Sequence, residues 1–203
     1  RITLIAVGGY GRGEMAPHSD VDIGFLTPGK QTPWAERVIE SMLYALWDLG
    51  LKLGQSSRSL DEMVRQAKAD VTVRTALLEA RYVCGDTDLY EQASHRFKTE
   101  VQADTARTFI ADKLAERDAR HRKMGDTRYV VEPNVKEGKG GLRDLHALFW
   151  IGKYIYDVQR AAELVEVGLF TKAEYRLFHR ADNFFQAVRC HLHSITGRAE
   201  DRL

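Results

Sequence analysis

The chain has 203 residues, of which 44% are hydrophobic and 29% are charged, as in an ordinary soluble globular protein. This length fits one large domain or two small ones, and the composition excludes disorder as the main state. The formal net charge of +1 gives no signature of polyanion binding, so we expect no nucleic-acid partner. Apolar runs are short, no secretory leader opens the chain, and Cys84 and Cys190 lie far apart. We therefore expect a cytoplasmic protein with reduced cysteines and no membrane partner.

The first part of the chain predicts an α/β arrangement. Apolar residues 2–7 run into two glycines, which is typical of a buried strand that ends in a tight turn. Residues 20–26 alternate polar and apolar side chains and predict a second strand. The further elements expected here are a helix over 33–50 with an apolar stripe of Val38, Met42, Leu46 and Leu49, a strand over 51–59, and a mostly helical stretch over 60–83.

The rest of the chain has a helical pattern. The expected elements are one long charged helix over 89–123, a glycine-rich insertion over 126–141, and helices over 142–157 and 172–195. In the last helix, apolar residues recur at spacings of three and four and predict a bundle core: Ala173, Leu177, Ala181, Phe184, Val188, Leu192 and Ile195. We therefore predict an α/β domain with a small mixed sheet over 1–87, followed by an all-α helical-bundle domain over 88–203.

The segment between the first two strands carries the most informative chemistry. Gly8 and Gly9 permit unusual dihedral angles and let backbone N–H groups approach an anion, and Arg12 can place a cation on phosphate oxygens. Asp20 and Asp22 stand two positions apart on a strand and therefore face the same way. Two carboxylates on one face repel unless a cation lies between them, and hard oxygen ligands suit Mg²⁺ or Mn²⁺ with substrate phosphates. This combination indicates nucleotidyl or phosphoryl transfer.

Each half of this motif is common by itself. A Gly-Gly-x-Gly string is usually a turn, and an Asp-x-Asp pair at a strand edge is usually solvated. The string lacks the Gly-Lys-Ser/Thr of a Walker A loop and the spacing of the dinucleotide-binding fingerprint. The two halves at this spacing, with Ser19 directly before Asp20, are much rarer by chance, which favours the functional interpretation.

Three strings resemble a known family. GGYGRGEMAPHSDVDI at 8–23 resembles the DNA polymerase β-like nucleotidyltransferase motif and, more narrowly, the bacterial PII uridylyltransferase/uridylyl-removing enzymes of nitrogen regulation. LWDLGLKLG at 46–54 is similar to the third-strand region of that family. EPNVKEGKGGLRDL at 132–145 is similar to the signature of the family's helical domain. The resemblance therefore covers essentially the whole chain.

The resemblance implies an activity and a division of labour among residues. It implies Mg²⁺-dependent transfer of UMP from UTP to a tyrosine of the PII signal-transduction protein, with release of pyrophosphate. Asp20 and Asp22 would hold the metal ion, and Gly8, Gly9 and Ser19 would cradle the UTP phosphates, with Arg12 nearby. A metal ion would stabilise charge on both the entering and the leaving oxygen.

The third-strand string departs from the family pattern. Lys52 stands where the family commonly has an acidic residue, and Gln55 stands where histidine is common. The superfamily often has a third carboxylate on this strand, as a metal ligand or a base, so the general base is not identified by the sequence. Asp70 is a candidate from its place in the sequence alone, and a helix cap before Val71 is the more frequent role for such a residue.

The glycine-rich string near residue 140 is a second candidate site. It carries Asn134, Lys136, Glu137, Arg143 and Asp144 just before a helix, where an anion is favoured. Without the family resemblance, a charged surface loop with a helix cap at Asp144 is the preferred interpretation. With the resemblance, we expect this loop to lie over the nucleotide and to supply these residues to its site.

Two further functions stay open. The chain is also compatible with an enzyme like glutamine synthetase adenylyltransferase, which shares the superfamily motif, or with a pseudo-transferase that binds a nucleotide without turnover. The family's uridylyl-removing HD domain needs an adjacent His-Asp pair, which this sequence lacks, and its glutamine-sensing ACT domains are not expected at this length. We therefore expect the N-terminal transferase part only.

A metal site at Cys190, His191 and His193 is not favoured. These residues do not share one helix face, so packing or surface roles are expected for them.

Overall fold

In the computed structural model, residues 1–127 and 129–203 are described, and they divide into two compact units. Unit 1 consists of Arg1–Met15 and Ser19–Ala103, and unit 2 consists of Ala16–His18 and Asp104–Leu203. The contacts thus divide the chain after Ala103, whereas the predicted domain boundary after residue 87 stays a prediction. Arg128, inside the predicted insertion over 126–141, lies outside the described residues.

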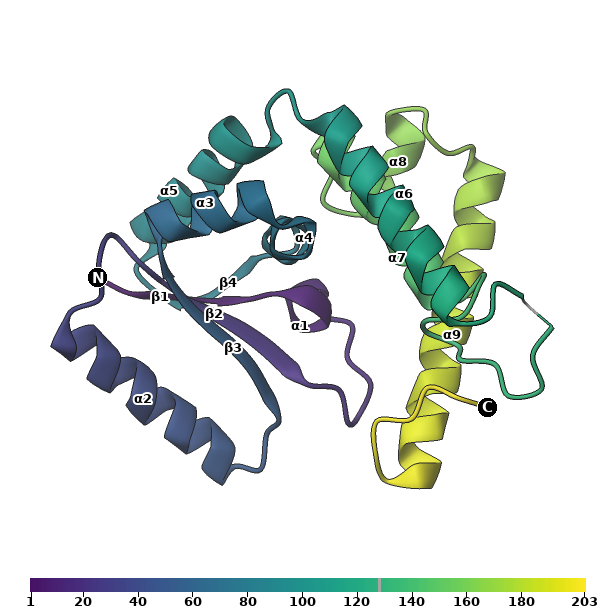
Figure 1. Ribbon diagram of the computed structural model, residues 1–203, viewed down its shortest axis with the longest axis horizontal. Coiled ribbons are helices and arrows are strands. Elements are labelled where there is room, and N and C mark those ends of the chain that lie inside the picture. The colour runs from purple at the N-terminus through teal and green to yellow at the C-terminus, as the bar shows by residue number, and fades with distance from the viewer. Residues whose placement is uncertain (128) are drawn as a thin grey trace. The chain divides into compact units, whose positions relative to one another are not determined.

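Unit 1 contains a four-stranded mixed sheet in the order β3-β2-β1-β4 (Figure 1). Its strands are β1 (Thr3–Ala6), β2 (Val21–Thr27), β3 (Leu53–Ser59) and β4 (Arg81–Gly85). β1 pairs antiparallel with β2 and with β4, whereas β2 and β3 run parallel. The first three strands confirm the sequence prediction. The mostly helical prediction for 60–83 is wrong at its end, because the Arg81–Gly85 segment pairs with β1 as an edge strand.

Helix α2 (Pro33–Asp48) covers one face of this sheet (Figure 1). The hydroxyl of Thr32 accepts the Ala35 N–H and caps the helix, and proline fits the first helical position. The buried residues of this layer are Ala35, Ile39 and Leu43 of the helix and Leu4, Ile23 and Phe25 of the sheet.

The predicted apolar stripe of α2 therefore needs correction. Met42 and Leu46 are partly buried and pack against the buried cluster, as predicted, but Leu49 is 74% exposed because it follows the helix as its C-cap.

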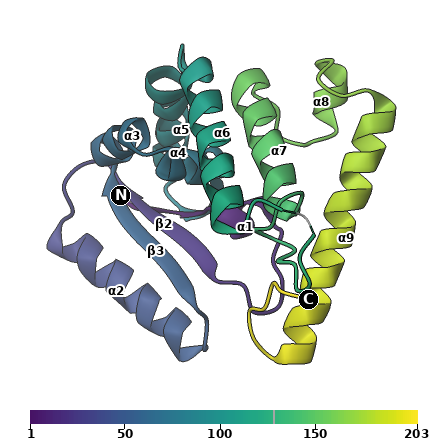
Figure 2. The same ribbon diagram turned by 45° about the vertical axis from the view of Figure 1, so that its right-hand side comes forward.

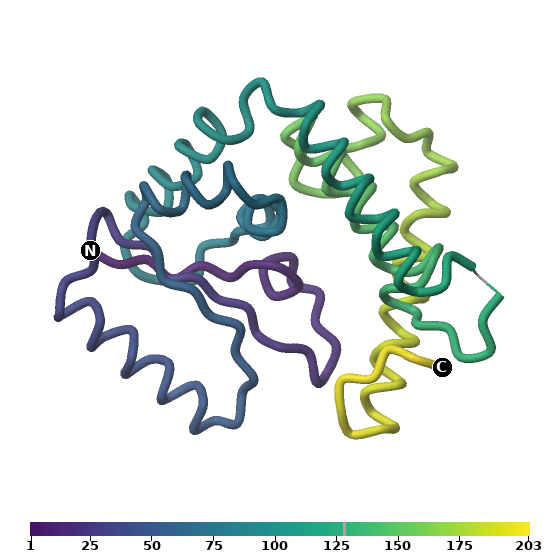
Figure 3. The backbone as a smooth tube through the Cα atoms, in the orientation of Figure 1, coloured from purple at the N-terminus to yellow at the C-terminus, as the bar shows by residue number. Residues whose placement is uncertain are grey.

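The other helices of unit 1 are α1 (Gly8–Arg12), α3 (Leu60–Ala69), α4 (Val71–Leu78), α5 (Thr87–Arg96) and the π-helical turn η1 (Phe97–Gln102). The Asp70 carboxylate accepts the N–H groups of Thr72 and Val73 and caps α4, which confirms the helix-cap interpretation of this residue. The single long helix predicted over 89–123 is wrong. The chain breaks around Asp104, whose φ of 57° is left-handed, as the trace in Figure 3 shows.

Unit 2 contains the helices α6 (Ala106–Lys123), α7 (Leu142–Tyr156), α8 (Glu163–Glu166) and α9 (Lys172–Thr196), of which α6, α7 and α9 are the long ones (Figure 2). Phe109 and Tyr154 stack with ring centroids 3.9 Å apart, and Leu142 and Leu164 are fully buried in the same unit. One isolated bridge joins Asn134 to Arg202.

The predicted core stripe of α9 is wrong. Leu177, Phe184 and Ile195 are 64%, 63% and 82% exposed, whereas the buried side chains of this helix are Arg189 and His193. A helical period identifies a face, but the partner of that face is decided by tertiary packing. Over the described residues, no helix has the length and apolar character that crossing a membrane requires.

Candidate active site

The glycine turn after β1 starts beside Asp22 of the neighbouring strand β2. Val7 is extended, and its N–H donates to the carbonyl of Asp22 at 3.0 Å, so the chain leaves the sheet beside that residue. Gly8 then takes a φ of +56°, a conformation that L side chains rarely adopt, and starts the short helix α1. The first N–H groups of a helix have no partner within it, so this turn presents backbone donors near Asp22.

The Asp22 carboxylate lies between two glycines. A Cβ on Gly8 would stand 3.1 Å from Oδ2 of Asp22, and a Cβ on Gly54 would overlap Oδ1. Gly54 is adjacent because Asp22 and Gly54 are register partners in the parallel pair of β2 and β3. The absence of two side chains thus makes room for this carboxylate, and the sequence reasoning missed Gly54 because only the strand pairing reveals it.

Asp20 stands at the entrance to β2. Val21 N–H donates to the Lys52 carbonyl at 2.8 Å, and Val21 pairs with Leu53, so the register continues to place position 20 beside position 52. Asp20 and Lys52 are both exposed, and Ser19 is half-buried. Asp22 is thus the second residue of β2, whereas Asp20 lies just before this strand and the exposed Lys52 just before β3. That the two carboxylates share one face stays a prediction.

The guanidinium of Arg12 is held by two carboxylates. Its Nε lies 2.7 Å from Glu14 Oε2, and its Nη1 pairs with Glu79, whose side chain is almost fully buried. Burial by itself would lower the pKa of Arg12, but the charges of Glu79 and Glu14 outweigh it and raise that pKa. Arg12 thus anchors the C-terminal end of α1, and its predicted contact with phosphate stays a prediction.

In unit 2, hydrogen bonds within the loop before α7 hold the conformation of that loop. The Asn134 side chain accepts the N–H groups of Lys136 and Glu137 at 3.0 and 2.7 Å. The N–H groups of Leu142 and Arg143 donate to the carbonyls of Val135 and Lys136, both at 2.9 Å. This pattern is an Asx turn closed onto the first residues of a helix.

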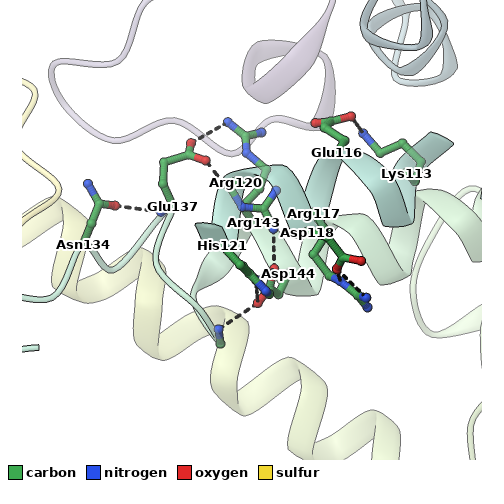
Figure 4. A network of polar contacts seen from close by, with 11 residues as sticks. Lys113, Glu116, Arg117, Asp118, Arg120, His121, Asn134, Glu137, Arg143 and Asp144 are labelled. Atoms are coloured by element: carbon green, nitrogen blue, oxygen red, sulfur yellow. Dashed lines mark hydrogen bonds and ion pairs between the residues drawn. The ribbon is translucent and has the colours of Figure 1, made fainter. Parts of the chain in front are cut away.

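The charged side chains of this loop form one network with α6 (Figure 4). Arg143 lies 3.0 Å from Glu137, and Arg120 of α6 pairs with Asp144 and approaches Glu137 at 3.9 Å. His121 Nε2 lies 2.9 Å from Asp144, which also accepts the Gly140 N–H at 2.7 Å. Asp144 is therefore an acceptor in the first turn of α7, although Gly141 and not Asp144 is the N-cap.

Two lysines in the same unit are desolvated. Lys113 of α6 is 2% exposed, bonds Glu116 at 2.7 Å and lies 4.3 Å from the centre of the Trp150 ring. Burial is the main cause that lowers the pKa of Lys113 and that of Lys136, whose Nζ lies 3.9 Å from Asp201.

The predicted site residues are distributed over both units. Unit 1 contains Gly8, Gly9, Ser19, Asp20 and Asp22, and among these the structure shows Gly8 beside the Asp22 carboxylate. Unit 2 assembles the second group: Asn134, Lys136, Glu137, Arg143 and Asp144. Asp70 serves as the cap of α4.

Sequence reasoning missed the α6 partners of the second group. These partners are Arg120 and His121, which both pair with Asp144.

Comparison with known proteins relates both parts of the chain to nucleotidyltransferases. Residues 1–83 match the family model of the nucleotidyltransferase domain, and residues 108–203 match that of the GlnD PII-uridylyltransferases. All 203 residues align with proteins named bifunctional uridylyltransferase/uridylyl-removing enzyme, with 70% identity in Novosphingobium aromaticivorans, 66% in Erythrobacter litoralis and 58% in a Bradyrhizobium species. The chain is related to these enzymes over its whole length.

The match covers the whole of this chain but only part of each relative. This chain spans 22% of the length of each of those relatives. Its first 83 residues match the nucleotidyltransferase-domain model, and the small mixed sheet that the sequence predicted lies in this part of the chain. The sites for the uridylyl-transferring activity named in the relatives are therefore sought in the groups just described.

Proposed function

We propose that this chain carries the UMP-transferring site of a PII uridylyltransferase, in which UTP donates UMP to a tyrosine of a PII-type protein. The observation that carries this proposal is the Asp20–Asp22 pair beside the Gly8 turn, on a nucleotidyltransferase domain whose relatives are named uridylyltransferases. The cellular role in nitrogen regulation follows from the same relationship.

The residues present fit a Mg²⁺ ion, with Mn²⁺ as a possible substitute. Asp22 sits in a cradle that a Cβ on Gly8 or Gly54 would fill, and Asp20, two positions before it, is proposed as the second carboxylate ligand. Within the described residues, no group of three or more His, Cys, Asp or Glu side chains could hold a metal ion. Proteins usually bind Mg²⁺ through one or two carboxylates together with substrate phosphates, and the Asp20–Asp22 pair would supply two such carboxylates. When bound, the ion would supply positive charge to the phosphate oxygens.

The chain's own residues would orient the nucleotide. The N–H groups of Gly8 and Gly9, at the start of α1, would donate to phosphate oxygens, and the Ser19 hydroxyl would contribute a further hydrogen bond. In the reaction, the tyrosine oxygen forms a bond to the α-phosphorus, the bond to the β-phosphate oxygen breaks, and pyrophosphate leaves. Lys136 and Arg143 are proposed as additional cations for the nucleotide, and the fixed loop geometry supports that role.

The decisive experiment is mass spectrometry of a PII-type protein after incubation with this protein at its natural full length, UTP and Mg²⁺. We expect a gain of one UMP on a tyrosine. Asp22→Asn keeps the shape of the side chain and removes its charge, so transfer should fall by at least about 100-fold. Full activity of this variant would contradict the metal assignment, and a gain of AMP from ATP with none from UTP would favour the adenylyltransferase alternative.

A second candidate function rests on Lys52. An ammonium group beside the carboxylate pair is unusual for a metal site, so a protein that binds UTP without turnover is also considered. Tight UTP binding without any UMP on the acceptor would support this candidate.

A further inference from the structure

The segment that follows α9 pairs with the beginning of the loop before α7. The Val135 N–H donates to the backbone carbonyl of Asp201 at 2.8 Å, and the bridge between Asn134 and Arg202 lies next to this bond. The pairing brings the side chain of Asp201 to Lys136, which follows Val135 and belongs to the second group of predicted site residues. Every one of these contacts lies within unit 2.

The two oxygens of the Asp201 carboxylate have different neighbours. Oδ1 accepts a hydrogen bond from Arg189 Nε at 2.7 Å and lies 3.6 Å from His193 Nε2, and both of these side chains are buried on α9. Oδ2 lies 3.9 Å from Nζ of Lys136, whose side chain is 32% exposed. The carboxylate is therefore fixed on its buried side by α9 and meets a solvent-accessible ammonium group on the other.

The surroundings of Lys136 are unfavourable to a positive charge. Burial is the largest cause that lowers the pKa of Lys136, and the charges of Arg143 and then Arg189 lower it further. Asp201 and then Glu137 oppose this shift. Glu137 itself pairs with Arg143 at 3.0 Å, whereas Asp201 approaches Lys136 directly. Asp201 is thus the main group that favours a charged ammonium at this position.

We propose that Asp201 is a positioning residue, which holds the ammonium group of Lys136 where it can meet the phosphates of a nucleotide. This role rests on the proposed function, since that function assigns Lys136 to the nucleotide. A half-buried lysine beside two arginines would otherwise turn away from them or lose its proton, and a neutral amine makes only the weaker, uncharged kind of hydrogen bond to a phosphate.

The direction of the effect of Asp201→Asn separates positioning from simple charge. The substitution removes a negative charge near the proposed phosphate contact, so by charge alone it should strengthen the binding of an anion such as UTP. If Asp201 acts through Lys136, the same substitution should weaken that binding. The backbone bond from Val135 is kept, because it uses the main-chain carbonyl. Asp118→Asn is the matched control, since this carboxylate is 49% exposed and pairs with its neighbour Arg117.

The variants are compared at natural full length by two measurements. The affinity for UTP should be at least about threefold weaker in Asp201→Asn at about pH 7.5, and the difference from the wild type should widen toward about pH 9 as Lys136 loses its proton earlier. With Lys136→Arg in both proteins this widening should disappear, because a guanidinium stays charged. Competitive acetylation, read by mass spectrometry, should modify Lys136 at least about three times faster in Asp201→Asn, since only the neutral amine reacts. Asp118→Asn should stay within about twofold of the wild type in both measurements.

Each outcome bears on the proposal. Equal or stronger UTP binding in Asp201→Asn would overturn it, as would unchanged acetylation of Lys136. If the wild type binds UTP but transfers no UMP, the proposed function fails while both measurements still test Asp201. If the wild type transfers UMP and Lys136→Met binds UTP as tightly, the proposed function stands and the role of Asp201 is refuted.

A double variant covers the case in which Asp201→Asn does not fold. Asp201→Asn with Arg189→Gln removes both members of the buried pair, so no buried charge is left without a partner and the net charge is unchanged. Weaker UTP binding in this double variant supports the proposal, and unchanged binding overturns it.

Discussion

The position of the Asp22 carboxylate depends on two neighbouring glycines that have no side chain. The alternation of β2 indicates that Asp20 and Asp22 share a face, but the room for the Asp22 carboxylate comes from Gly8 and Gly54. Gly54 lies 32 positions away and becomes a neighbour through the parallel register. The site is thus sensitive to a residue that carries no chemistry of its own.

Gly54→Ala should impair the site without unfolding the protein. The added Cβ would overlap Asp22 Oδ1 and displace the carboxylate, and a misplacement of about 1 Å can cost about 100-fold in rate. We therefore expect UMP transfer to fall at least about tenfold. Gly29→Ala is the control, since a Cβ there meets nothing within 4 Å, and it should stay within about twofold of the wild type. Equal rates for the two variants would contradict the described cradle.

Lys52→Glu should strengthen metal binding. Position 52 borders Asp20, so the change replaces a positive charge by a negative one beside the proposed cation. At surface dielectric values such a change contributes about 1–2 kcal/mol, which corresponds to about tenfold in affinity. Titration of Mn²⁺ in the presence of UTP measures it, with Lys30→Glu, an exposed lysine beyond the other end of β2, as the control. Weaker binding in Lys52→Glu would place Lys52 away from the cation.

At the scale of elements, α1 is held at its C-terminal end by charged groups. Arg12 pairs with Glu14 and Glu79, and Arg81 donates to the carbonyls of Gly11 and Tyr10 at 3.2 and 3.0 Å. These contacts connect the glycine turn to the segment from the end of α4 to β4. The residues that hold this turn, which is proposed to bind phosphate, thus include ones about 70 positions later in the sequence.

Glu79→Gln should destabilise unit 1. Removing one partner of a buried ion pair leaves its charge poorly compensated, and the typical loss is about 3 kcal/mol. Urea denaturation measures it. Arg160→Gln removes a pair whose arginine side chain is 80% exposed, and it should cost less than about 1 kcal/mol. Equal losses in the two variants would show that the Arg12–Glu79 pair is not a buried anchor.

At the scale of the whole molecule, the chain forms two contact-defined units, and a buried histidine makes one of them sensitive to acid. Burial first, and then the charge of Arg189, lower the pKa of His193 from its ordinary value of about 6.5, while Asp201 opposes this shift and His18 adds to it. Lys136 is the further charged group on Asp201. The folded state thus resists protonation of His193 more than the unfolded state does.

The sign of the resulting pH dependence follows from proton linkage. As the pH falls below about 6.5, His193 becomes protonated in the unfolded chain but stays neutral in the folded chain, because its pKa is lowered there. Protonation of the unfolded state alone lowers the free energy of unfolding, so the stability that the neutral ring contributes is lost. Above that pH it is fully present. The difference in unfolding free energy between the wild type and His193→Asn should therefore shrink as the pH falls from 8 toward the lowered pKa. A constant difference across this range would contradict the burial of a neutral His193.

The sequence by itself determined the first three strands and helix α2, and from it came the proposal that Asp20 and Asp22 hold a metal ion. These features depend on local causes: period-two alternation, Thr32 with Pro33 at a helix start, and glycines at the end of a strand. The resemblance of the GGYGRGE and EPNVKEG strings to a family was likewise legible in the sequence, and the relatives confirm it.

Only the tertiary structure decided what those features contact. The segment Arg81–Gly85 is a strand because it pairs with β1 at the edge of the sheet. Leu177 and Phe184 of α9 are exposed, so the helical spacing of apolar residues did not decide which of them are buried. The cradle of Asp22 and the burial of His193 also join residues far apart in the chain. Local propensity contains no information about such pairs, because their free energy arises only when the folded chain brings both members together and removes water between them.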